Sequence, residues 1–193
     1  MADSSNDSRR QALLRAAFDA IYEHGFEGLR LRAVATAAGI DHSTLHHYFP
    51  TKEHLVTEVV AYATQQFWPT MPAEGSGRQR LRVHLAGLGR MIRERPDLFV
   101  VLAELDLRAD RDPAIRSIME HIEDGWRGVL AEALGAADLS VATDPADAVE
   151  LVIATVKGVR LVPERAERTL YQLAHLLTGE TNGRTGNHTT GEE

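Results

Sequence analysis

The 193-residue chain contains no cysteine. This absence excludes disulfide frameworks, thiolate metal sites, iron–sulfur clusters and cysteine nucleophiles, and it makes an intracellular location the simpler interpretation. No run of about 18 apolar residues occurs, so we expect no transmembrane helix. The first residues are polar, which predicts no secretory signal. We therefore expect a cytoplasmic protein that does not bind membranes.

Basic residues are fewer than acidic ones, and the net charge is −7. Residues 1–55 contain six Lys or Arg and seven Asp or Glu, so most of the excess acidity lies in the C-terminal part. This balance argues against a protein that coats nucleic acid by bulk positive charge, although a local contact is still compatible with it. Hydrophobic residues make up 44% and charged residues 25% of the chain, as in globular proteins, so the chain should fold.

Strand patterns are scarce, whereas apolar residues recur at helical spacing along the chain. We predict an all-α fold of about nine helices. The expected helices cover residues 9–23, 31–38, 44–49, 52–67, 78–94, 96–107, 113–134, 145–161 and 164–178. Asp112 and Asp144 precede prolines that begin two of these helices, so both are expected to act as N-caps. Residues 69–77 are interpreted as a linker.

Two short apolar stretches, residues 31–38 and 44–49, are separated by a segment that begins with Gly39. A glycine that ends one short helix, followed by an N-cap candidate such as Asp41 and a second short helix, is typical of a helix-turn-helix. Residues 42–52 contain no Asp or Glu. A helix that enters the major groove needs this absence, because carboxylates would meet phosphates there.

Within the second short helix, Leu45 and Phe49 stand four residues apart and are expected to hold it against the first. Ala35 and Ala38 are small enough to allow that approach. The remaining side chains carry hydrogen-bonding groups and are expected to point outward or sideways, toward base edges and phosphates: Ser43, Thr44, His46, His47 and Tyr48.

Some of these residues have other interpretations. His42 and His46 have the spacing of a metal-binding pair on a helix, as do His46 and His47 together with His54. No carboxylate or fourth ligand stands at a matching spacing, so we predict no metal site and no cofactor. Arg9 and Arg10 either begin a solvated helix or form an arm that reaches the minor groove.

The segment from Gly25 to Leu55 resembles the DNA-binding domain of the TetR family of bacterial transcriptional regulators. The resemblance covers roughly residues 9–55 and includes the Gly25-Phe26 turn, the pattern from Leu31 to Ile40 and the run from Ser43 to Leu55. It implies that Arg32 and Lys52 hold the DNA backbone or a nearby base. It further implies that the groove is faced by His42, Ser43, Thr44, His46 and Tyr48, with His47 beside them. His46 stands where the family commonly has tyrosine.

For the C-terminal part, the resemblance implies a helical domain that binds a small-molecule effector and forms a homodimer through its last two helices, about residues 145–178. The helix expected at 145–161 is apolar over much of its girth, so either the monomer core or a second copy must cover it on more than one side. Large or aromatic residues are expected around a ligand: Phe67, Trp68, Met91, Phe99, Met119, Ile122 and Trp126. Glu104 and Asp106 either meet a polar ligand group or face water.

These observations predict a flexible arm at residues 1–8, a DNA-binding domain at 9–55, a ligand-binding and dimerisation domain at 56–179 and a disordered tail at 180–193. The expected protein is a repressor that binds palindromic double-stranded operator DNA and is released by a small molecule. An all-helical enzyme or a protein-binding adaptor is the alternative. The scattered His and carboxylate residues have no catalytic spacing, so we predict that the protein is not an enzyme.

Overall fold

The computed structural model describes residues 2–137 and 144–179 of the chain. Within these ranges it contains nine α-helices, two short 3-10 helices and no strand, which confirms the all-α fold. The bounds are α1 (Ala2–His24), η1 (Phe26–Gly28), α2 (Leu31–Ala37), α3 (His42–Tyr48), α4 (Lys52–Gln65), η2 (Trp68–Thr70), α5 (Gly77–Glu94), α6 (Pro96–Ala109), α7 (Pro113–Gly135), α8 (Pro145–Val159) and α9 (Pro163–Thr178). Except at the start of α1, every expected helix end lies within two residues of the observed one.

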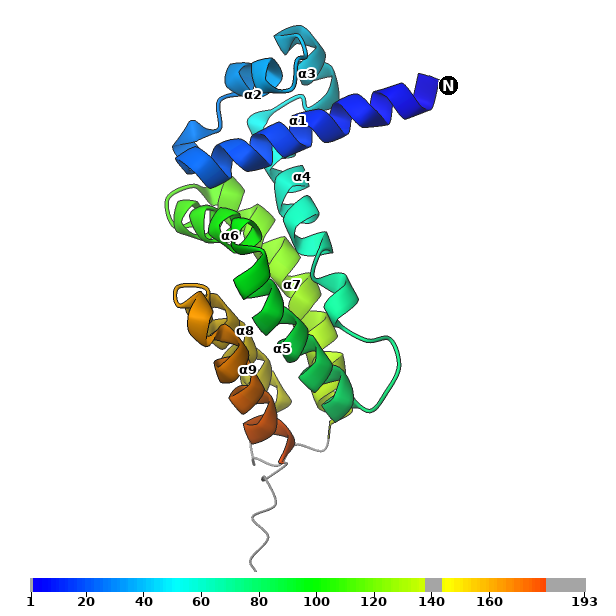
Figure 1. Cartoon of the computed structure of the whole chain (residues 1–193), viewed down its shortest axis with the longest axis vertical. Helices are drawn as coiled ribbons and strands as arrows, with labels where there is room; N and C mark the ends of the chain where they lie inside the picture. The colour runs from blue at the N-terminus through cyan, green and yellow to red at the C-terminus, as the bar shows by residue number, and fades with distance from the viewer. Residues whose placement is uncertain (1, 138–143, 180–193) are drawn as a thin grey trace, which may run out of the picture.

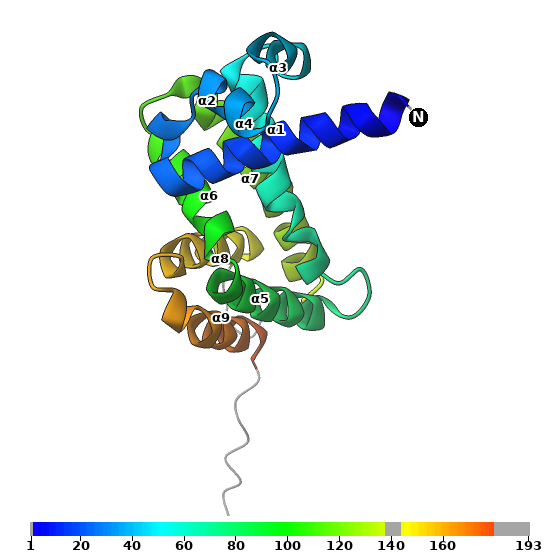
Figure 2. The same cartoon turned by 45° about the horizontal axis from the view of Figure 1, so that its top comes forward.

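The helices form two groups that α4 joins. Helices α1 to α3 cluster at one end of the molecule, and α4 leads from this cluster into the bundle of α5 to α9 (Figures 1 and 2). The apolar stripe of α1 explains the first group, because its members point into one core between the helices. The buried residues of this stripe are Leu13, Leu14, Ala17, Phe18 and Ile21.

Two of the three candidate N-caps make the bonds expected of them. The carboxylate of Asp112 accepts a hydrogen bond from the backbone N–H of Ala114 at 3.1 Å, and that of Asp144 accepts one from Ala146 at 2.8 Å. Each bond satisfies a donor that the first helical turn leaves unpaired. Asp41 stands at the N-cap position of α3, but its side chain makes no capping hydrogen bond.

The expected flexible arm at residues 1–8 is wrong for residues 2–8, because α1 already begins at Ala2. Asp7 lies in the N-terminal half of this helix, and negative residues are generally favourable toward a helix N-terminus. The sequence prediction relied on apolar periodicity, which begins only after this polar stretch. The tail expected at 180–193 lies outside the described residues.

Contacts from the first turns of α1 to two other helices support this longer helix. The hydroxyl of Tyr48 on α3 donates to Oδ1 of Asn6 at 2.5 Å. The guanidinium of Arg10 pairs with Glu58 on α4 at 2.7 Å and lies 5.6 Å from the ring centre of Phe49. Arg10 therefore belongs to the packing of the helix cluster, which argues against a role in a separate arm.

In the bundle, α5 and α9 run side by side at very short range (Figure 1). A Cβ atom added at Gly89 on α5 would lie 2.9 Å from the Cα of Glu167 on α9, so only glycine permits this approach. Leucines of both helices are fully or almost fully buried in the same hydrophobic core: Leu81, Leu85 and Leu88 on α5, and Leu170 and Leu173 on α9.

Candidate DNA-binding face and ligand cavity

Helices α2 and α3 form the expected helix-turn-helix. Leu45 and Phe49 have exposed fractions of 0% and 1%, so they do hold α3 against its neighbours. The turn passes through Gly39 at φ 66°, a conformation that favours glycine. It is closed by the N–H of Ile40, which donates to the carbonyl of Ala35 at 2.9 Å. The turn thereby fixes the angle at which α3 leaves α2.

The outer face of α3 consists of the residues that the sequence placed there. Ser43, His46 and His47 are exposed. His42, Thr44 and Tyr48 are partly buried beside them, and Arg32 is exposed in the first turn of α2. Because no Asp or Glu occurs between residues 42 and 52, this face offers donors and cations without a carboxylate that would repel phosphate.

The histidines of α3 contact one another but complete no metal site. The rings of His42 and His46 meet edge to face, with their centres 4.6 Å apart, and Nδ1 of His46 lies 3.4 Å from the carbonyl oxygen of Pro50. Throughout the part of the chain that the structure describes, no group of three or more His, Asp or Glu side chains is arranged to hold a metal ion.

Lys52, at the start of α4, is engaged inside the protein. Its ammonium lies 4.2 Å from the ring centre of Phe26, and the guanidinium of Arg108 lies 4.9 Å from the same centre. Burial lowers the pKa of Lys52, although the nearby carboxylate of Glu27 acts in the opposite direction. Lys52 therefore interacts with an aromatic ring of the junction between the two helix groups.

That junction connects the turn after α1 to α6. The carboxylate of Glu104 accepts a hydrogen bond from the N–H of Phe26 at 3.3 Å, and Arg108 pairs with Glu27 at 3.0 Å. Gly25 has a φ of 69°, and a Cβ atom there would lie 2.9 Å from the carboxylate of Glu104. Glu104 therefore does not line the cavity and does not simply face water. Its carboxylate binds the backbone of the helix cluster.

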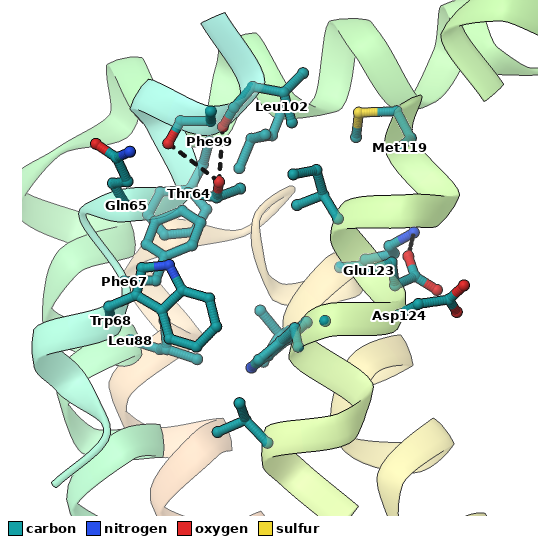
Figure 3. A pocket seen from close by; sticks show the side chains of 18 of the residues that line it. Thr64, Gln65, Phe67, Trp68, Leu88, Phe99, Leu102, Met119, Glu123 and Asp124 are labelled. Atoms are coloured by element: carbon teal, nitrogen blue, oxygen red, sulfur yellow. Dashed lines mark hydrogen bonds and ion pairs between the residues drawn. The ribbon is translucent and has the colours of Figure 1, made fainter. Parts of the chain in front are cut away.

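A cavity of about 450 Å³ lies between α4, η2, α5, α6, α7 and α8 (Figure 3). Six of the seven residues expected around a ligand line it: Phe67, Trp68, Phe99, Met119, Ile122 and Trp126. Met91 does not, because Leu88 is the last residue of α5 that reaches the cavity and Met91 lies one turn beyond it. The volume is within the usual range for small-molecule sites.

The wall formed by the end of α4 and by α6 is aromatic. The rings of Phe67 and Phe99 are stacked, with centres 5.3 Å apart and planes 20° apart. Figure 3 shows Phe67 and Trp68 on one side of the cavity and Met119 on the other. Trp68 is 52% exposed, whereas Phe99 is buried, so the cavity extends from solvent into the bundle.

A buried histidine connects the far wall to the linker after α4. Nε1 of Trp126 donates to Nε2 of His84 at 3.0 Å, and Nδ1 of His84 lies 2.7 Å from the hydroxyl of Thr70. Because an indole nitrogen can only donate, the ring proton of neutral His84 resides on Nδ1. Burial lowers the pKa of His84 to about 4, so the ring is neutral at pH 7. Thr70 in turn donates to the carbonyl of Phe67 at 2.5 Å.

Five Asp, Glu, Lys and Arg residues line the cavity. Four of them are linked to one another by ion pairs, and we call them the charged cluster: Asp106, Glu123, Lys157 and Arg160. The fifth, Asp124, pairs with Arg127. Arg160 pairs with Asp106 at 2.6 Å. Lys157 pairs with Asp106 at 3.4 Å and also with Glu123. The sequence singled out only Asp106. For Lys157 and Arg160, the available signal in the sequence was a pair of cations near the end of an otherwise apolar helix.

The last two helices divide their apolar residues between the core and the surface. Val152 and Val156 of α8 are buried within the single chain. The large apolar residues of this region that are exposed are Leu151 at 50%, Leu161 at 79%, Val162 at 37%, Tyr171 at 47% and Leu176 at 66%. Gly158, on α8, lies near Leu161 in the sequence, and a Cβ atom at Gly158 would meet nothing within 4 Å.

No helix in residues 2–137 or 144–179 has the length and hydropathy needed to cross a bilayer.

Comparisons with known proteins agree with this geometry. Residues 13–59 match the family described as bacterial regulatory proteins, tetR family. The HTH-type transcriptional regulator CymR of Pseudomonas putida is 27% identical over 180 residues, which cover 83% of this chain and 78% of CymR. The similar proteins are transcriptional regulators and not enzymes.

Two solved structures share the fold over most of its length. A TetR-family transcriptional regulator from Rhodococcus sp. superposes with a TM-score of 0.78 at 24% identity, covering 89% of this chain and 99% of that one. The structure of AibR, in complex with isovaleryl coenzyme A and operator DNA, superposes with a TM-score of 0.71 at 18% identity, covering 90% and 100%.

Proposed function

Because this chain belongs to the TetR family of bacterial transcriptional regulators, we propose that it is a repressor that binds a palindromic operator as a homodimer and leaves it on binding a small molecule. The observation that carries this proposal is one helix, α4, that begins beside the outer face of α3 and ends in the wall of a mostly apolar cavity. The AibR structure, which contains both a ligand and operator DNA, supports it. The protein would act in the cytoplasm, where bacterial DNA lies.

We assign DNA binding to residues 9–55 and ligand binding with dimerisation to residues 56–179. Base edges and phosphates would be contacted by Arg32, His42, Ser43, Thr44, His46, His47, Tyr48 and Lys52. Arg32 is exposed and ready to meet phosphate. Lys52 would first leave the ring of Phe26, so we assign it a smaller share of the phosphate contacts.

The homodimer would form through the outer faces of α8 and α9. Isolated exposed apolar residues are common on monomers, but Leu151 on α8 and Leu161 just after its end are both exposed, at 50% and 79%. Gly158 lies between them and leaves room for a helix of the second copy. An isologous contact of this kind produces the twofold symmetry that a palindromic site requires. The monomer core already accounts for Val152 and Val156, so these two residues are not part of the proposed interface.

Release would follow from the shared position of α4. Val60, Ala61 and Thr64 of α4 line the cavity, and Phe67 stacks on Phe99 just beyond it. A ligand that fits best with a different position of α4 would change the separation of the two α3 helices in the dimer. A twofold dimer grips its site only when that separation matches the helical repeat of DNA, about 34–36 Å. If the ligand favours the mismatched separation by about 3 kcal/mol, operator affinity falls roughly a hundredfold.

The test of this function is selection of bound duplexes from a random DNA pool by the full chain, followed by a gel shift at moderate salt. We expect an enriched inverted repeat whose half-sites lie about 10 base pairs apart, centre to centre, or a multiple of that distance. The matched control is a duplex with one half-site scrambled, which should bind far more weakly. Recovery of no common sequence would contradict DNA recognition and would favour the protein-binding adaptor.

A further inference from the structure

The charged cluster beside the cavity has hydrogen-bond donors to spare, and its carboxylates are already paired with cations. Both oxygens of Asp106 accept from cations, Oδ1 from Lys157 and Oδ2 from Arg160. Both oxygens of Glu123 do so as well, Oε1 from Arg127 at 2.9 Å and Oε2 from Lys157. A molecule entering the cavity would therefore meet carboxylates whose charge is balanced within the protein.

Arg160 is the source of the spare donors. Its side chain is only 10% exposed, and it lines the cavity. A guanidinium has five N–H groups. In the described part of the chain, Arg160 uses two of them, one to Asp106 and one to the backbone carbonyl of Lys157 at 3.4 Å. The three others have no partner there. A buried guanidinium with a free edge is suited to a planar oxyanion, which it binds through two parallel hydrogen bonds.

The charges around the cavity are mixed, so the net charge does not by itself select an anion. The four residues of the charged cluster are neutral as a group. Asp124 also lines the cavity, but its side chain is 71% exposed and pairs with Arg127. Water and salt screen such an exposed charge far more than a buried one. The preference for an anion therefore rests on the free N–H groups of the buried Arg160.

The rest of the cavity offers apolar surface. Phe67, Phe99 and Leu102 form its aromatic and aliphatic wall. The polar pair in the far wall is closed, because His84 and Trp126 bond to each other and His84 also contacts Thr70. A ligand body in this region gains by burying hydrocarbon, and it finds no open polar partner in that pair.

We propose that the effector is a monoanionic amphiphile, with a carboxylate head on Arg160 and Lys157 and an aromatic or branched hydrocarbon body against Phe67 and Phe99. This inference rests on the proposed function, since it takes the cavity to be the effector site. Arg160 determines the charge of the ligand, because its free N–H groups match two oxygens of one carboxylate. Lys157 supplies the second positive charge.

Three probes of one shape and different charge test the head group: 3-phenylpropanoate, 3-phenylpropanamide and 3-phenylpropylamine. Both tryptophans of the chain, Trp68 and Trp126, line the cavity, so its occupancy is read from their emission on excitation at the red edge of the indole band. We expect the carboxylate to bind about tenfold or more tightly than the amide, and the amine to bind most weakly. An amine that bound most tightly would overturn the assignment.

Variants locate the head group. Arg160→Gln should weaken the carboxylate about tenfold or more and leave the neutral amide within about twofold of its wild-type affinity, because only the anion loses a charged partner. Lys157→Gln should have the same direction and a smaller effect. Arg15→Gln, on the exposed side of α1, is the matched control and should change neither. Equal weakening of carboxylate and amide by Arg160→Gln would indicate a structural role and would contradict the proposal.

The charge of the ligand and the release of DNA by a ligand are tested by different outcomes. If none of the three probes changes the tryptophan emission, the cavity is not a site for such molecules, and ligand release fails together with the head-group assignment. If the amide or the amine binds in preference to the carboxylate and releases operator DNA, the proposed function stands and the monoanion is wrong. The ranking in the wild-type protein decides the second case even where a variant does not fold.

Discussion

Acid should destabilise this protein in part through a single buried side chain, His84. The unfolded chain takes up a proton at this histidine near its ordinary pKa of 6.5, whereas burial lowers the pKa in the folded state to about 4. Between these values the unfolded state binds more protons, so the free energy of unfolding rises with pH and falls on acidification. The contribution is fully present above pH 6.5 and is lost progressively down to about pH 4.

The size of the effect follows from this interval. It spans about 2.5 pH units, and each unit corresponds to about 1.4 kcal/mol. Protonation of His84 therefore costs about 3 kcal/mol of stability between pH 7 and pH 4. That is a large part of the free energy of unfolding of a typical domain, which is roughly 5–15 kcal/mol. The carboxylates of the chain add their own pH dependence, so the contribution of His84 must be isolated by a variant.

His84→Gln removes the titration and keeps an amide that can accept from Trp126 and donate to Thr70. Urea unfolding followed by far-ultraviolet circular dichroism at several pH values, at one protein concentration, gives both stability curves. We expect the variant to be less stable than the wild type at pH 7 and to lose about 2–3 kcal/mol less on acidification. His24→Gln, at an exposed histidine, is the control and should follow the wild type. Parallel curves for His84→Gln and the wild type would refute the reasoning.

Three further outcomes are expected. Arg32→Ala should lower the log–log salt slope of operator binding by about one, whereas the exposed Arg90→Ala on α5 should leave it unchanged; equal slopes in both variants would remove Arg32 from the phosphate contacts. Leu151→Asp should produce monomers in sedimentation. Val83→Asp, which introduces the same charge at an exposed apolar residue on α5, is the control and should stay dimeric; a dimeric Leu151→Asp would place the interface elsewhere. Gly25→Ala should lower the free energy of unfolding by about 1–3 kcal/mol in urea titration, since its φ is positive and its Cβ would crowd Glu104. An unchanged urea midpoint and slope for Gly25→Ala would show that the contact between Gly25 and Glu104 adjusts without a loss of stability.

The sequence predicted the helices well because their ends are local. A proline in the first turn and a preceding aspartate set the start of α7 and of α8 regardless of what packs around them. The start of α1 was missed for the converse reason. Residues 2–8 are polar and leave no periodic trace, and the bond from Tyr48 to Asn6 joins positions 42 residues apart.

The cavity was predicted by size and aromatic character, and its polar chemistry was not. Phe67 and Trp126 are conspicuous in any helical sequence, whereas His84 on α5 looks like a surface residue until Trp126 is placed against it. Arg160 follows an apolar helix, where a solvated cation at the helix end is the ordinary expectation. Only the approach of α6 to α8, which places Asp106 beside Arg160, distinguishes the two situations. Such pairings depend on tertiary structure, which no local pattern contains.

The undivided course of α4 limits how such a protein can be recombined. A chimera cut between residues 55 and 56 would join the first turn of one parent's α4 to the later turns of another's, and the new helix would have to fit both the core around Leu45 and the cavity. A crossover in the loop at residues 71–76, after η2, would keep α4 intact but would carry Ala61, Thr64 and Phe67 along with the DNA-binding half. Exchange of operator specificity and exchange of ligand specificity are therefore not separable by any single junction. A domain swap in this chain therefore transfers part of the cavity wall together with the DNA-binding helices.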